Sequence, residues 1–81
     1  FDKKINLVVL IDRIKVINTK NGKKMAFITV SDEYDTIDVV VFPNEINLIN
    51  DLKNNDIVLL RGKVEKRMSK YQVLLENITK L

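Results

Sequence analysis

Hydrophobic and polar residues alternate along most of the chain, as they do in strands that bury one face. In the first apolar segment, between Ile5 and Ile17, this alternation changes phase. The apolar residues from Ile5 to Ile11 include the odd-numbered positions, whereas Ile14 and Val16 lie at even-numbered ones. A strand that changes its buried face midway is bent, because it is shared between two sheets or carries a bulge. The pattern therefore predicts one long, bent first strand.

A polar segment over residues 18–24 separates this strand from a second one, predicted over Met25–Ser31. The segment contains Asn21-Gly22, the strongest short signal for a hairpin. Phe27 has the opposite parity to the aliphatic residues of the second strand, so we expect its ring to project away from the core. Those aliphatic residues are Ala26, Ile28 and Val30.

The next segment predicts a third strand followed by a helix. After a turn over residues 32–36, alternation continues from Ile37 to Phe42, and Pro43 stops it because proline cannot donate to a strand ladder. Residues Asn44–Lys53 then place apolar side chains at helical spacing, which predicts an amphipathic helix of about three turns. We expect Phe42 to pack against this helix.

Two further strands complete the chain, over Ile57–Arg67 and Tyr71–Ile78, with Gly62 expected to mark a bulge or tight bend. Five strands, with one short helix between the third and fourth, indicate an all-β fold. This order suits a small five-stranded Greek-key barrel, the OB-fold, which binds oligonucleotides and oligosaccharides.

Composition narrows the possible functions. The chain has 81 residues, of which 46% are hydrophobic and 31% charged, and it has no Cys and no His. One domain over residues 1–81 is expected at this length. The missing residue types exclude disulfides, thiolate nucleophiles, most zinc sites and a histidine base, so we expect no enzyme activity from this domain alone and no cofactor. No apolar run reaches the roughly 20 residues of a membrane span, and the absence of Cys and of a signal peptide fits a cytoplasmic protein.

Charge is distributed unevenly along the chain, although the net charge is only +3. Residues 1–30 carry seven basic and two acidic side chains, residues 31–56 one basic and seven acidic, and residues 57–81 six basic and two acidic. If the fold brings the two basic segments together, one side of the molecule becomes cationic and can follow a phosphate backbone.

Three segments resemble a known family: Gly22–Asp32, Ile37–Pro43 and Ile57–Val64. Together they look like the single-strand-binding barrel of the bacterial replicative DNA polymerase III alpha subunit, and the resemblance covers nearly the whole chain. It implies a non-catalytic domain, cut from a longer polymerase chain, that holds single-stranded template and contacts other domains of that polymerase. Such families often carry a glycine in the turn between strands two and three, whereas residues 33–36 of this chain contain none.

In this barrel the outward face of the second and third strands binds the ligand, between the loop joining strands one and two and the loop joining strands four and five. We therefore expect Phe27 to stack on a base, although it could instead pack under a loop or against another domain. Tyr71 could stack at the rim or serve equally well as a barrel residue. The predicted basic contacts are Lys20, Lys23, Lys24, Arg61, Lys63, Lys66, Arg67 and Lys70.

Three alternatives stay open at this point. The barrel could recognise a tRNA anticodon, or its outward face could dock another replication protein. The carboxylates at positions 32, 33, 35 and 38 could also hold a cation, but the acidic residues of the turn are ordinary turn residues. Asp38 lies on the expected binding face, where it could accept hydrogen bonds from base edges or pair with a lysine.

Overall fold

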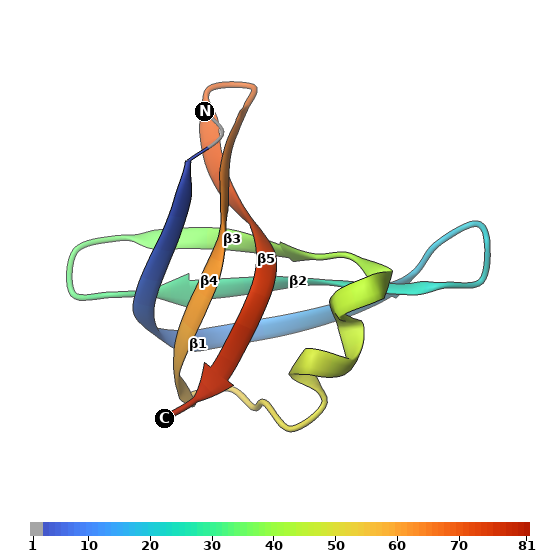
Figure 1. The fold of residues 1–81 in the computed structure, drawn as a ribbon, viewed down its shortest axis with the longest axis horizontal. Coiled ribbons are helices and arrows are strands. Elements are labelled where there is room, and N and C mark those ends of the chain that lie inside the picture. The colour runs from blue at the N-terminus through green and yellow to red at the C-terminus, as the bar shows by residue number, and fades with distance from the viewer. Residues whose placement is uncertain (1–2) are drawn as a thin grey trace.

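The computed structural model describes residues 3–81, and the fold consists of five strands and one short helix (Figure 1). The elements are β1 (Lys4–Asn18), β2 (Lys24–Ser31), β3 (Thr36–Val41), the 3₁₀ helix η1 (Pro43–Ile49), β4 (Ile57–Arg67) and β5 (Lys70–Lys80). All five predicted strands are confirmed. No helix in the described part of the chain is long and apolar enough to cross a membrane.

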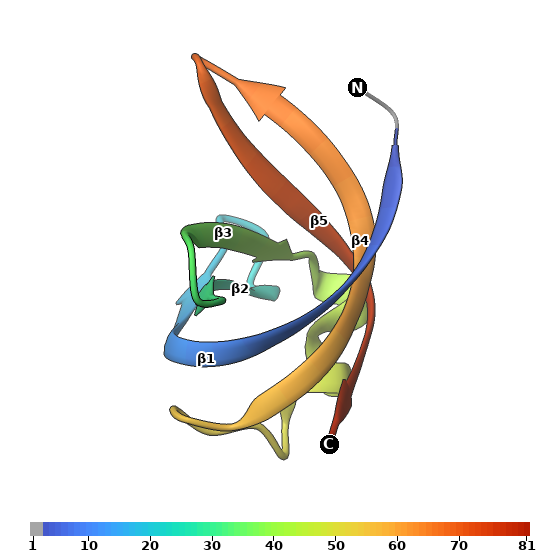
Figure 2. The ribbon, with the colours of Figure 1, turned by 90° about the vertical axis from the view of Figure 1, so that its left-hand side faces the viewer.

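The strands close into a barrel in the order β1-β2-β3-β5-β4. The β3–β5 pair is parallel and the other four pairs are antiparallel, so the chain must cross from β3 through η1 and β4 before it returns beside β3 in β5. Figure 2 shows β2 and β3 on one side of the barrel and β4 on the other. The predicted five-stranded Greek-key OB-fold is confirmed.

β1 belongs to both halves of the barrel. Lys4–Leu10 pairs with β4 and Leu10–Asn18 pairs with β2, and the register shifts between Ile11 and Arg13. The extra residue at this bulge exchanges the inward and outward faces of the strand. This confirms the bent first strand and explains the change of phase in its sequence.

The barrel interior is filled by aliphatic side chains, which drive its closure by removing apolar surface from water. η1 contacts β2 and β5 and buries Ile49, while Ile46 and Leu52 pack against the same cluster. The buried cluster comprises Val9, Ile11, Ala26, Ile28, Val30, Val39, Val41, Ile49, Val58, Leu60, Val73, Leu75 and Ile78.

The predicted three-turn helix over Asn44–Lys53 is wrong in length and type, because η1 is a 3₁₀ helix that ends at Ile49. Pro43 stands at its start, and no side chain caps that end. Asparagine recurs at positions 44, 47 and 50, and its side chain competes with helical backbone hydrogen bonds. A short, tight helix is what remains.

Phe42 is also placed differently from the expectation. β3 ends at Val41, and Phe42 continues in an extended conformation with φ −76° and ψ 163°. Its side chain is 42% exposed and is not part of the buried cluster. The strand alternation extends one residue beyond the ladder and gives Phe42 the parity of Val40, which lies outside the core cluster although it is buried.

The β1–β2 and β4–β5 hairpins use different turn geometries. In the β1–β2 hairpin, the backbone N–H of Gly22 donates to the carbonyl of Thr19 at 3.0 Å, and Gly22 has φ +74°, so the predicted hairpin is confirmed. In the β4–β5 hairpin, Met68 and Ser69 both have positive φ, at 51° and 71°. This is the conformation that two-residue hairpins favour, although glycine and asparagine adopt it at lower cost.

Gly62 permits a close approach between β4 and β5. The register shifts here, since Arg61 pairs with Asn77 and Gly62 with Leu75, so Glu76 is the extra residue. A Cβ atom at position 62 would lie 2.5 Å from the carbonyl oxygen of Leu74 and would also collide with Val73. The expected bulge is confirmed.

We therefore expect Gly62→Ala to lower the free energy of unfolding by about 1 to 3 kcal/mol, because the added methyl group must push the two strands apart. Urea denaturation monitored by circular dichroism measures the change. Thr79→Ala, on the exposed face of β5, is the control and should stay within about 0.5 kcal/mol of wild type. A Gly62→Ala protein as stable as wild type would contradict the close packing described here.

Candidate nucleic-acid interface

The outward faces of β2 and β3, together with the second half of β1, form one continuous surface, which we call the platform. At its centre, Lys15, Phe27 and Val40 are directly opposite one another on β1, β2 and β3, although Val40 itself is only 5% exposed. Phe27 is 39% exposed, whereas its neighbours Ala26 and Ile28 are fully buried. The predicted outward orientation of Phe27 is therefore confirmed, while its role in stacking stays a prediction.

The platform contains two basic residues that sequence reasoning missed. Lys15 lies opposite Phe27, and Arg13 lies opposite Thr29 in the next row. Both are exposed. The phase change in β1 carried the signal, because Ile14, which packs against the core, places positions 13 and 15 outward. Phe42 extends the outward side of β3 and adds a second exposed ring.

Two basic hairpins project beyond the platform, the β1–β2 hairpin at the right of Figure 1 and the β4–β5 hairpin at its top. All their basic side chains are exposed. Lys66 Nζ lies 5.8 Å from the centre of the Tyr71 ring, within cation–π range. The predicted residues in these two regions are Lys20, Lys23 and Lys24 in the first and Lys66, Arg67, Lys70 and Tyr71 in the second.

Arg61 and Lys63 lie on β4 outside these two hairpins, and Lys63 is in the same cross-strand row as Phe27, through Leu74 of β5 and Val40 of β3. On β4 they pair with the first half of β1, where Arg61 lies opposite Asn6. Figure 2 shows β4 across the barrel from β2. Arg61 Nε lies 3.9 Å from Glu76 Oε1, and Lys4 Nζ lies 3.6 Å from Glu76 Oε2.

The β2–β3 connection, at the left of Figure 1, is acidic. Asp32 accepts hydrogen bonds from the backbone N–H groups of Tyr34 at 2.8 Å and Asp35 at 2.9 Å, and these bonds lower the pKa of Asp32. Asp35 accepts one from the N–H of Thr36 at 2.8 Å. Within residues 3–81, no group of three or more potential ligand side chains could hold a metal ion. Asp32 and Asp35 stabilise the turn through these backbone hydrogen bonds.

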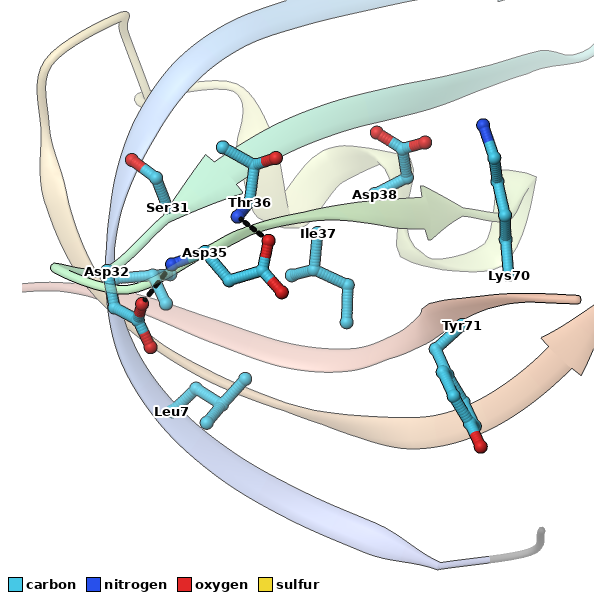
Figure 3. A pocket seen from close by; sticks show the side chains of 10 residues that line it. Leu7, Ser31, Asp32, Asp35, Thr36, Ile37, Asp38, Lys70 and Tyr71 are labelled. Atoms are coloured by element: carbon cyan, nitrogen blue, oxygen red, sulfur yellow. Dashed lines mark hydrogen bonds between the residues drawn. The ribbon is translucent and has the colours of Figure 1, made fainter.

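Two cavities lie on either side of the β3–β5 junction. The larger, of about 430 Å³, opens at the barrel end away from η1 and is lined by Leu7, Ile37 and Tyr71 together with the acidic connection (Figure 3). The smaller, of about 360 Å³, lies between Asp38 and the β4–β5 hairpin. Figure 3 shows Asp38 and Lys70 extending to one side of these strands, and Ile37 and Tyr71 to the other.

Residues 5–81 match the family model of the OB-fold nucleic acid binding domain. The chain belongs to this family. The match spans every strand except the first residue of β1.

Two bacterial proteins show which members of the family are similar in sequence. The chain is 37% identical over 76 residues to the DNA polymerase III subunit alpha of Staphylococcus aureus, and 36% identical over 74 residues to that of Bacillus subtilis. These matches cover 93% and 90% of the chain. The chain spans about 7% of the length of each relative.

Solved structures share the fold at low sequence identity. The mitochondrial single-stranded DNA binding protein Rim1 of S. cerevisiae has a TM-score of 0.80 and 10% identity, with 100% of this chain and 95% of that chain covered. The second OB-fold domain of replication protein A from Methanococcus maripaludis has a TM-score of 0.66 and 20% identity, covering 100% and 84%. The likeness establishes the architecture.

The lowered pKa of Asp32 predicts how the β2–β3 connection responds to pH. Its stabilising charge is fully present above the ordinary carboxyl value of 3.8, and is lost as the pH falls through the lower value of the folded protein. We therefore expect Asp32→Asn to be less stable than wild type near neutral pH, with the difference shrinking in acid. Urea denaturation over a pH series measures this, with Glu33→Gln as the control for charge. A difference independent of pH would contradict it.

Proposed function

We propose that this chain is a sequence-tolerant single-stranded DNA-binding module of a replicative DNA polymerase and that it positions the template strand. The observation that carries the proposal is the exposed ring of Phe27 beside Lys15 at the centre of the platform. An aromatic ring offers a face for stacking on any base, and an adjacent cation attracts the phosphate backbone.

The charge distribution supports one path for the strand. The β1–β2 and β4–β5 hairpins are basic, whereas the β2–β3 connection carries three carboxylates and no basic residue. Phosphates are attracted to the first two regions and repelled from the third. The strand would then run from the β1–β2 hairpin, over Phe27, to the β4–β5 hairpin.

The relatives support the polymerase context. They are named as alpha subunits of DNA polymerase III, and this barrel corresponds to about 7% of their length. A module of this size would bind template while catalysis takes place elsewhere in such a chain. Other domains of that polymerase would then be its covalent partners.

Phe27→Ala should weaken binding of a labelled DNA homopolymer by about 1 to 3 kcal/mol, the usual contribution of one stacking aromatic ring. Fluorescence anisotropy measures the affinity, and the corresponding RNA homopolymer is titrated in parallel. Tyr34→Ala removes an exposed ring from the acidic connection and should leave the affinity unchanged. Equal affinities for Phe27→Ala and wild type would overturn the stacking role, and a preference for RNA would favour an anticodon-type ligand.

Lys15→Glu should also weaken binding, because it places a negative charge beside Phe27. If Lys15 contacts one phosphate, the slope of log affinity against log salt should become shallower by about 0.7, the single-strand value for one contact. Lys53→Glu makes the same change of net charge in the connection between η1 and β4. Equal effects of the two variants would show that only net charge matters and that the platform has no special role.

A further inference from the structure

The smaller cavity places an acidic side chain on a surface that is otherwise suited to a polyanion. Asp38 is exposed on the outward side of β3, in the row next to Phe27. The hydroxyl of Thr29 donates to its Oδ1 over a long 3.5 Å. A carboxylate repels phosphate, so the part of a nucleic acid that Asp38 can bind is a base with N–H donors.

The neighbouring residue supplies a complementary donor. Gln72 of β5 lies directly opposite Asp38 in the parallel β3–β5 ladder, and both side chains line the 360 Å³ cavity. A carboxylate offers two acceptor oxygens, and the side-chain amide of glutamine offers an N–H donor. The pair can therefore present one donor beside two acceptors.

Among the common bases, guanine has the matching edge. Its Watson–Crick edge carries an acceptor, O6, followed by two adjacent donors, N1–H and the 2-amino group. Thymine instead offers one N–H between two carbonyl oxygens. Cytosine and adenine each offer one amino group beside a ring nitrogen that would face the second carboxylate oxygen. Only guanine can thus use both oxygens of Asp38 and the amide of Gln72.

The remaining walls of the cavity suit a base that belongs to a strand. Met68, at the tip of the β4–β5 hairpin, is 93% exposed and provides a polarisable side chain that can cover a ring face. Arg67 and Lys70 line the same cavity and provide cations for the flanking phosphates.

We propose that this cavity holds one base of the bound strand and that Asp38 and Gln72 select guanine there. The inference rests on the proposed single-strand binding and adds a base preference at one position to an otherwise sequence-tolerant surface. Its residues are distinct from the stacking ring and from the basic residues of the platform.

Three labelled oligonucleotides of equal length test the proposal by fluorescence anisotropy with the 81-residue chain. One is all thymine, one has a single central guanine, and one has hypoxanthine in its place, which lacks the 2-amino group. A single guanine avoids the four-stranded structures of guanine runs. We expect the guanine oligonucleotide to bind about 5-fold or more tightly than all-thymine, with hypoxanthine between them.

Asp38→Asn should reduce the guanine advantage to less than about 2-fold, and Gln72→Leu should reduce it without altering charge. Glu33→Gln, an equal change of charge in the β2–β3 connection, should retain it. Equal binding of all three oligonucleotides to wild type would overturn the base preference and leave the proposed function standing. Failure of every oligonucleotide to bind would overturn both. The hypoxanthine comparison needs no variant, so it decides the question even if Asp38→Asn does not fold.

Discussion

The bulge between Ile11 and Arg13 is the constraint on which both the barrel and the binding surface depend. Without it, one strand could not bury Val9 where it pairs with β4 and Ile11 where it pairs with β2, and then turn Ile14 toward the same core. The same exchange of faces places Arg13 and Lys15 outward beside β2. A single inserted residue therefore both closes the core and supplies cations to the platform.

Close packing on the opposite side of the barrel completes the closure. Gly62 lets the backbone of β5 approach β4 at the point where Glu76 bulges out of the ladder. Glu76 then lies within ion-pair distance of Arg61 and Lys4, on the outer face of the β1–β4 pair. Exposed pairs of this kind contribute little stability.

The platform combines features that serve different parts of a nucleic acid. Phe27 presents an apolar ring, the two hairpins present cations, and Asp38 with Gln72 presents hydrogen-bonding groups. Stacking and phosphate attraction are indifferent to sequence, whereas acceptors and donors at fixed positions discriminate among bases. A mainly sequence-tolerant surface can in this way contain one position that reads base identity.

The sequence by itself determined the strands, the bend in β1, the β1–β2 hairpin and the outward direction of Phe27, because these follow from local alternation and turn chemistry. It did not determine the length of η1, where proline and three asparagines weaken a helix that apolar spacing favours. Phe42 was misplaced for a related reason, since the end of β3 depends on its pairing partners.

Only the tertiary structure decided which charged residues share a face. Arg61 and Lys63 are close in sequence, yet Arg61 lies within ion-pair distance of Glu76 whereas Lys63 lies in the cross-strand row of Phe27. Conversely, Asp38 and Gln72 are far apart in sequence and become neighbours only through the parallel β3–β5 pairing. Local sequence patterns fix the direction of each side chain along its own strand, but neighbours across strands arise from closure of the barrel, which depends on the whole chain at once.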